Sequence, residues 1–337
     1  MSIGNLISFF VLVIGNRNSK LGYRPYINLR DPHLKLFFGM LVPVMLSSMI
    51  SEINAIVDRN MAASLQVGTV SALNYSSRLI SVITAFVGAS IGKAMMPQMA
   101  QNHATGEVST LRSQIENVMK TLIPVIVPLT IGVILLAEPI IRILFQRSNF
   151  TATDTIITAQ CMRYYAIGLL SSNMNPIQIR VFYAMKKTKI PAVISVTAMS
   201  LNIVLNLALI GVLQHRGLAL ATSISACVSF VLFQVIIRSD LGSLKLYKHF
   251  TEWLKLVLAL TVMSGVVVAG IRILPVMTGT YMQCLLSTVG FVGFAILVYG
   301  GLLIILKTEI AGMVIRLLTG LTEKRHKIAD HKVIYRI

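Results

Sequence analysis

The chain has 337 residues, of which 55% are hydrophobic and only 12% are charged, with a mean hydropathy of +0.77. This composition excludes a soluble or disordered chain and indicates a polytopic membrane protein whose surroundings are membrane lipids. The formal net charge of +18 does not predict nucleic-acid binding, because the basic residues lie between apolar stretches and not in a soluble domain.

Eight apolar stretches are each near the ~20 residues that a helix needs to cross a bilayer. Their approximate ranges, in chain order, are 34–57, 71–95, 118–144, 155–185, 191–212, 218–237, 254–274 and 281–306. The sequence therefore predicts an all-α polytopic membrane protein with eight transmembrane helices. In the fourth stretch, Pro176 and the amides beside it predict a break in the helix within residues 171–180.

The segments that flank these stretches are polar and basic. Residues 1–33 hold a partial apolar helix and a basic linker, and residues 307–337 form a basic tail with a predicted interfacial helix around 310–321. Of the 30 Lys and Arg residues, six fall between spans on one side, Arg78 lies inside a span, and all the others fall on the opposite side. Because basic residues accumulate in cytoplasmic loops, both ends of the chain are predicted to be cytoplasmic.

The second span carries a charge inside its apolar sequence. Ser71, Asn74, Arg78 and Ser81 follow one another at helical spacing, so they are predicted to share one face. A cation within hydrocarbon costs roughly 2.5–3.5 kcal/mol on insertion scales, so it normally faces a protein interior or a wet cavity. Arg78 can pair with a neighbouring helix or snorkel, but Asn74 and the serines favour the wall of a polar cavity.

A second set of polar residues lies on three different spans. Asp58 ends the first span, and Thr222 lies about one turn into the sixth. Asn202 and Asn206 are four residues apart, so they share a face of the fifth span. A carboxylate, two amide carbonyls and a hydroxyl at similar depth would suit a small hard cation. The alternative is that the two amides link helices by hydrogen bonds and Asp58 pairs with Arg59.

Nothing in the sequence predicts an enzyme. There is no phosphate-binding loop, nucleophile triad or paired-carboxylate site. The three cysteines lie within apolar stretches at unrelated spacings, so they indicate packing and neither a disulfide framework nor a metal motif.

Six segments carry a resemblance to a known family. They are INAIVDRNMAASLQVGTVSALNYSSRLISV at 53–82, IGKAMMPQMA at 91–100, ILFQRSNFTATD at 143–154, RVFYAMKKTKIPA at 180–192, LNIVLNLALIG at 201–211 and GLALATSISA at 217–226. They occur in family order over about residues 20–240. With them the chain resembles the lipid II flippases, MurJ or MviN, of the multidrug/oligosaccharidyl-lipid/polysaccharide exporter superfamily.

The resemblance implies a function in bacterial cell-wall synthesis. Family members move the undecaprenyl-diphosphate-linked peptidoglycan precursor across the cytoplasmic (inner) membrane by alternating access. Arg78 matches a cavity arginine that faces the headgroup, with Asn74 and Ser81 beside it as binding residues. Asp58, Asn202, Asn206 and Thr222 match a sodium site of some members, which implies sodium as a coupling ion and no other cofactor. Some members carry acidic residues where this chain has Ser77, Ser81 and Asn206.

The resemblance also implies a domain organisation. Residues 34–240 match a six-helix C-terminal lobe, and residues 241–306 match two terminal transmembrane helices. An N-terminal lobe is expected from the same chain or from another one, because alternating access rocks one repeat against the other. The alternatives are an exporter of another lipid-linked oligosaccharide and a non-transporting structural fragment.

Overall fold

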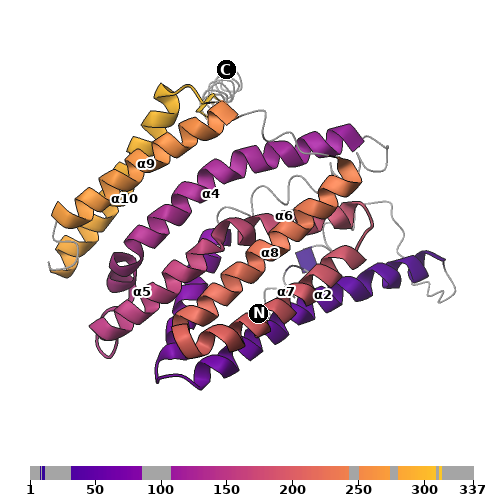
Figure 1. Ribbon diagram of the computed structural model, residues 1–337, viewed down its shortest axis with the longest axis horizontal. Coiled ribbons are helices and arrows are strands. Elements are labelled where there is room, and N and C mark those ends of the chain that lie inside the picture. Colours follow the sequence, from indigo (N-terminus) through magenta and orange to yellow (C-terminus); the bar gives the residue numbers. More distant parts are fainter. Residues whose placement is uncertain are drawn as a thin grey trace, which may run out of the picture. The chain divides into compact units, whose positions relative to one another are not determined.

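The computed structural model describes residues 8, 10–11, 32–85, 108–242, 250–273, 280–308 and 311–312 (Figure 1). The chain forms two compact units, Met1–Val42 and Pro43–Ile337. The first unit contributes the start of the first long helix, and the other long helices belong to the second unit. The predicted boundaries of the lobe and of the terminal helices stay predictions.

All regular structure in the described residues is helical. The helices are α2 (Pro32–Ala63), a helix over residues 69–85, α4 (Val108–Phe145), α5 (Ala152–Ile167), α6 (Leu169–Ala184), α7 (Lys189–Leu213), α8 (His215–Leu241), α9 (Phe250–Ile273) and α10 (Tyr281–Ile305). This confirms the all-α class. The predicted interfacial helix, basic linker and far end of the second span lie largely or wholly outside the described residues.

Six of these helices are long and apolar enough to cross a membrane. They are α2, α4, α7, α8, α9 and α10. Each coincides with a predicted span, although α4 begins ten residues before the predicted start at 118. Among the described residues, the second predicted span is helical only over 69–85. The fourth is divided between α5 and α6.

The predicted break in the fourth span at Pro176 is wrong. Pro176 lies inside α6, and the chain breaks eight residues earlier, at Gly168, between α5 and α6. Proline remains compatible with this helix because neighbouring groups can accommodate the freed carbonyl in a packed bundle.

Gly168 is required by the close approach of α8. A Cβ atom at this position would lie 2.9 Å from the Cα atom of Ser223. The Ser223 hydroxyl donates hydrogen bonds to the carbonyls of Tyr164 and Tyr165, at 2.6 and 3.3 Å. The α5–α6 break therefore places carbonyl groups against a donor from another helix, which satisfies them away from water.

The start of α5 is fixed by its own side chains. Thr151 and Asp154 form a capping box, in which the Thr151 amide donates to Asp154 Oδ2 at 2.8 Å and the Asp154 amide donates to Thr151 Oγ1 at 3.3 Å. The hydrogen bonds from Thr151 lower the pKa of the Asp154 carboxyl below its usual range. The preceding loop therefore stops and the helix begins at a defined residue.

The packed core of the second unit is built around α4. One apolar cluster joins α4 to α6, α7 and α8 through fully buried residues such as Ile126, Phe182 and Ile237. Another joins α4 to α9 and α10 through Leu136, Met263 and related side chains. In Figure 1, α7 and α8 run side by side as an antiparallel pair, which agrees with their direct packing.

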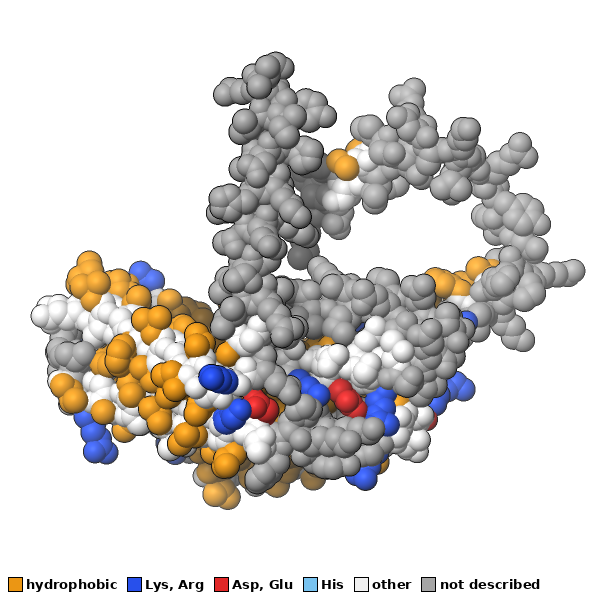
Figure 2. Space-filling model, turned by 90° about the horizontal axis from the view of Figure 1, so that it is seen from above, with side chains coloured by type: hydrophobic (Ala, Val, Ile, Leu, Met, Phe, Trp, Pro, Cys, Tyr) orange, Lys and Arg blue, Asp and Glu red, His pale blue; other side chains and the backbone are white. Residues whose placement is uncertain are grey.

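Large apolar side chains also cover much of the outer surface. Figure 2 shows them gathered over the part of the surface that α9 and α10 form, where Leu258, Leu286 and Leu297 are more than half exposed. Such a surface is expected of helices that contact lipid tails.

We expect Gly168→Ala to destabilise the bundle, because the added methyl group must displace Ser223 and the backbone of α8. Overpacking of this kind costs about 1–3 kcal/mol, which should lower the melting temperature of the purified protein. Gly211→Ala on α7 is the matched control, since no atom lies within 4 Å of its added methyl group. Equal melting temperatures for the two variants would contradict the close approach described above.

Candidate functional site

The four residues predicted as a cation site lie together in the structure. Asn206 Nδ2 donates to Asp58 Oδ1 at 2.6 Å and to Asn202 Oδ1 at 2.9 Å. Asn202 Nδ2 in turn donates to Thr222 Oγ1 at 3.4 Å. The cluster therefore joins the C-terminal end of α2 to α7 and α8.

The local structure of each helix brings these groups to one place. Asn202 and Asn206 are one turn apart on α7 and both are buried, with 1% and 0% of their surfaces exposed. The Thr222 hydroxyl is held by a hydrogen bond to the carbonyl of Leu218, one turn earlier on α8. Two fully buried amides on a transmembrane helix must find polar partners, because lipid offers none.

The amide of Asn202 has a second orientation that also satisfies its neighbours. With oxygen and nitrogen exchanged, its nitrogen lies 3.0 Å from Asp58 Oδ1 and 3.1 Å from Asn54 Oδ1. Its oxygen then accepts a hydrogen bond from the Thr222 amide at 3.1 Å. The oxygen and nitrogen of an asparagine amide are told apart by their hydrogen-bond partners, and each assignment of Asn202 satisfies a different set of neighbours.

The second arrangement requires a rotation of Asn206 as well. The nitrogens of Asn202 and Asn206 would otherwise face each other at 2.9 Å. After rotation, the Asn206 oxygen would face Asp58 Oδ1, and two oxygen atoms that close need a cation or a proton between them. In the first arrangement the Asn206 oxygen is buried and has no hydrogen-bond partner among the described residues.

These residues fit a small monovalent cation. The cluster offers the Asp58 carboxylate, the Asn202 oxygen in its present orientation, the Asn206 oxygen after rotation, and the Thr222 hydroxyl. These are oxygen donors of the kind that hard cations prefer. A single carboxylate would balance a single positive charge, so a bound monovalent ion leaves the buried cluster neutral.

A cavity lies between this cluster and Asn74, one of the three residues predicted to bind the substrate. Its volume is about 230 Å³, and Asp58, Asn74 and Thr222 are among the residues that line it. Asn74 therefore reaches the same space as the Asp58 carboxylate, although it lies on the helix over residues 69–85.

Arg78 and Ser81 lie on the same helix but outside that cavity lining. Both side chains are exposed. The Ser81 hydroxyl donates to the Ser77 carbonyl at 2.8 Å, and the Ser77 hydroxyl donates to the Asn74 carbonyl at 3.1 Å. Both serines are thus satisfied within the helix, which leaves the Arg78 guanidinium as the prominent charge of this face.

Two of the alternatives for these charges find no support in the described part of the chain. Its ion pairs are Arg112–Glu116, Arg163–Glu138, Lys187–Asp240 and Lys255–Glu252. Among the described residues, neither Arg78 nor Arg59 forms an ion pair within 4 Å. Asp58 is held instead by the amides of α7.

The structure adds two residues that the sequence did not single out. Asn54 lies one turn before Asp58 on α2, and Tyr165 comes from α5; both line the 230 Å³ cavity. The spacing of Asn54 from Asp58 was a usable signal, since residues four apart share a helix face. Tyr165 had no such signal, because its position depends on the packing of α5 against α8.

A bundle of transmembrane helices with a polar and partly hollow interior is an architecture that membrane transporters use. Its fold is that of the MOP exporter superfamily. The structure matches an outward-facing multidrug resistance MATE family transporter of this superfamily with a TM-score of 0.52 at 14% identity, over 80% of this chain and 64% of that one. It matches lipid II flippase MurJ in an inward closed conformation with a TM-score of 0.63 at 22% identity, over 89% and 61%.

The sequence comparisons identify the family. Residues 1–289 match the family model described as lipid II flippase MurJ. The chain is 29% identical to a probable lipid II flippase MurJ of Haemophilus influenzae, over 71% of this chain and 48% of that protein. It is 25% identical to one of Bdellovibrio bacteriovorus, over 91% and 58%. The chain belongs to the MurJ lipid II flippase family, and it spans about half the length of the curated relatives it matches.

We expect Asn206→Ala to destabilise the purified protein in sodium-free buffer. The substitution removes a buried donor from Asp58 and leaves the carboxylate short of a partner, which costs about 1–3 kcal/mol. Asn60→Ala is the matched control, because Asn60 is exposed two residues after Asp58. Thermal unfolding should separate the two variants, and an unchanged melting temperature for Asn206→Ala would show that the amide network contributes nothing to stability.

Proposed function

We propose that this chain forms the C-terminal part of a flippase for lipid II, the undecaprenyl-diphosphate-linked peptidoglycan precursor. It would act in the bacterial cytoplasmic membrane, with both termini in the cytoplasm, and supply cell-wall synthesis. An N-terminal lobe from the same or another chain would complete it, because transporters of this class work by rocking one lobe against the other. Membership of the MurJ family supports the proposal.

The observation that carries the substrate assignment is the exposed Arg78 guanidinium. It lies on a helix face with Asn74 and Ser81, and no acidic group among the described residues neutralises it. A diphosphate offers several anionic oxygens, and a guanidinium meets them with a fixed pair of parallel N–H groups that an ammonium lacks. We assign Arg78 to the diphosphate or the adjoining sugar, and Asn74 and Ser81 to hydrogen bonds with the headgroup.

We assign the Asp58 cluster to a coupling sodium ion. Binding of the ion would turn the amide of Asn206 away from its present hydrogen bond with Asp58, and so change how α2 is tied to α7. An ion can shift a conformational equilibrium only through a difference in its affinity for the two states. The Asn206 amide offers such a difference, since it presents a nitrogen donor to Asp58 in its present orientation and would present an oxygen after rotation.

An exporter of another lipid-linked oligosaccharide is the second candidate. The same fold occurs in a Pyrococcus furiosus MOP superfamily transporter whose binding pocket is described as reversed in polarity, with a TM-score of 0.53 at 13% identity over 80% of this chain and 64% of that one. The fold therefore serves more than one substrate class. Competition between lipid II and other undecaprenyl-diphosphate-linked oligosaccharides in a flipping assay would separate the two candidates.

We expect Arg78→Ala to abolish flipping in a protein with the N-terminal lobe restored, while the protein still inserts into the membrane. Arg78→Lys should restore activity only in part, because it keeps the charge and loses the bidentate geometry. The measurement is complementation of a flippase-depleted strain, with the membrane abundance of each variant measured alongside.

Arg238→Ala is the matched control for this experiment, because Arg238 is also exposed but lies at the far end of α8. It should complement like the unmodified protein. Full complementation by Arg78→Ala at normal abundance would rule out Arg78 as a substrate-binding residue. A collapse of abundance for Arg78→Ala alone would instead make Arg78 a structural residue.

We expect sodium to raise the melting temperature of the purified protein more than lithium or potassium does. A ligand at ~100 times its dissociation constant stabilises a folded state by about 2.7 kcal/mol. Asp58→Ala should lose this shift. Asp154→Ala should lower stability through the capping box of α5 yet keep the sodium shift. An equal sodium response in the unmodified protein and in Asp58→Ala would show that the cluster forms interhelical hydrogen bonds and does not bind sodium.

A further inference from the structure

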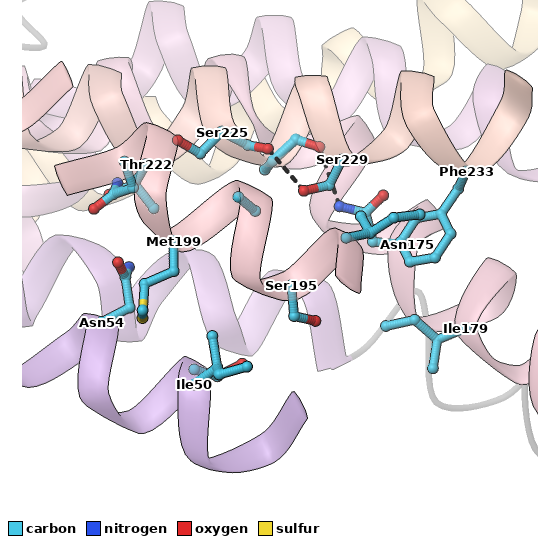
Figure 3. Close-up of a pocket in the computed structure, with 15 residues that line it drawn as sticks. Ile50, Asn54, Asn175, Ile179, Ser195, Met199, Thr222, Ser225, Ser229 and Phe233 are labelled. Carbon is cyan, nitrogen blue, oxygen red and sulfur yellow. Dashed lines mark hydrogen bonds between the residues drawn. The ribbon is translucent and has the colours of Figure 1, made fainter. Parts of the chain in front are cut away.

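A second cavity, with both polar and apolar side chains in its lining, lies next to the Asp58 cluster. Its volume is about 240 Å³, and it lies among α2, α6, α7 and α8 (Figure 3). Its polar lining consists of Ser51, Asn54, Asn175, Ser195, Asn202, Thr222, Ser225 and Ser229. A transmembrane bundle that needed only tight packing would fill this position with apolar side chains.

This cavity and the 230 Å³ cavity beside Asp58 share part of their walls. Ser51, Asn54 and Thr222 line both of them, and Asn202 of the cation cluster lines the second. The shared residues lie one or two turns from Asp58 along α2 and beside it on α8. The two cavities therefore meet at the candidate cation site.

Two buried oxygen atoms in the wall of the cavity have no hydrogen-bond partner in the described part of the chain. They are Ser225 Oγ, on a residue that is 5% exposed, and Asn175 Oδ1, whose own nitrogen donates to the Ala226 carbonyl at 3.1 Å. A buried polar atom without a partner costs about 1–3 kcal/mol. The volume far exceeds the ~10–15 Å³ that one water needs, so the site is polar and roomy enough for water or a hydrated ion.

The cavity extends from the cluster toward one end of the bundle. Along α7 its lining runs from Asn202 back to Ile194, which is eight residues or ~12 Å of helix. Along α8 it runs from Thr222 to Phe233. This is the end where α7 begins and α8 ends, which the distribution of basic residues predicts to be cytoplasmic.

Apolar side chains occur along the whole lining, with Ile50 and Met199 near Asn54 and three more at the far end. The three at the far end are Ile179, Ile194 and Phe233, and the ring of Phe233 packs against that of Phe182 with the centroids 5.6 Å apart. Ile194 and Phe233 are 4% and 2% exposed. A short apolar constriction beyond a polar chamber can open and close a path for ions by admitting or excluding water.

We propose that this polar cavity is the pathway by which the coupling cation moves between the cytoplasm and the Asp58 cluster. The side-chain oxygens of Ser225, Ser229 and Asn175 bind a hydrated monovalent cation transiently as it moves along the cavity. Phe233 and Ile194 form the gate at the cytoplasmic end. The proposal rests on the cation site proposed above, and it adds the side from which the ion reaches that site.

Silver ion tests the pathway, because it is a small monovalent cation that also bonds to cysteine thiolate. The experiment uses the whole chain in inverted membrane vesicles, with Cys161, Cys227 and Cys284 replaced by alanine. Ser229→Cys places a thiol on the cavity wall. Thr197→Cys is the matched control, because Thr197 lies on α7 but is exposed on the outer surface of the bundle. Later alkylation of the denatured protein measures the thiols that silver has not blocked.

We expect silver added from the cytoplasmic face to block Ser229→Cys at least tenfold faster than Thr197→Cys. Adding Phe233→Ala should speed the reaction further, and sodium should slow it in proportion to occupancy of the pathway. Ser195→Cys on the facing wall of α7 provides a second position if Ser229→Cys does not accumulate. Equal rates for cavity and control thiols, or reaction from the outer face alone, would overturn the pathway.

A result that rules out the cation site differs from a result that rules out the pathway. If the unmodified protein shows no sodium shift in melting temperature, the ion assignment fails whatever the silver rates are. If sodium stabilises the protein through Asp58 while the cavity thiols stay unreactive from the cytoplasmic face, the ion site stands and the pathway is wrong.

Discussion

The hydrogen bond between Asn206 and Asp58 is the interaction on which the site depends. At 2.6 Å it ties the C-terminal end of α2 to α7, and α2 has few other buried contacts, since only 6% of its membrane-spanning window is buried. A carboxylate within a membrane bundle needs a donor or a cation, because hydrocarbon solvates neither charge nor dipole. The same hydrogen bond therefore sets the state of the site and, together with the apolar cluster around Ala62, helps to hold α2.

This constraint explains why the site can respond to an ion. The Asn206 amide gives Asp58 a nitrogen donor in its present arrangement, and a half-turn of this amide would give Asp58 an oxygen in its place. The second arrangement is stable only with a positive charge between the oxygens. A cation would thus replace a direct link between α2 and α7 by a link through itself. A small change at the site would in this way change how a whole transmembrane helix is held.

Local spacing predicted which polar side chains share a helix face better than it predicted where a helix breaks. Asn202 and Asn206 share a helix face by their spacing alone, and the structure brings them to Asp58 and Thr222 as expected. The break at Gly168 could not be predicted in this way. It depends on the close approach of Ser223, which is 55 residues away in the sequence, and Pro176 gave a misleading local signal. The helix over residues 69–85 is exposed on the face that carries Arg78, and its sequence does not predict which group packs against that face.

The most direct test of this account is an experimental structure of the protein determined in sodium and again in choline. The account predicts density for an ion between Asp58 and the oxygens of Asn202 and Asn206 in sodium, with the Asn206 amide rotated. In choline the Asn206 nitrogen should donate to Asp58 as described above. The same amide arrangement in both salts, with the Asn206 nitrogen on Asp58 and no ion density, would contradict it.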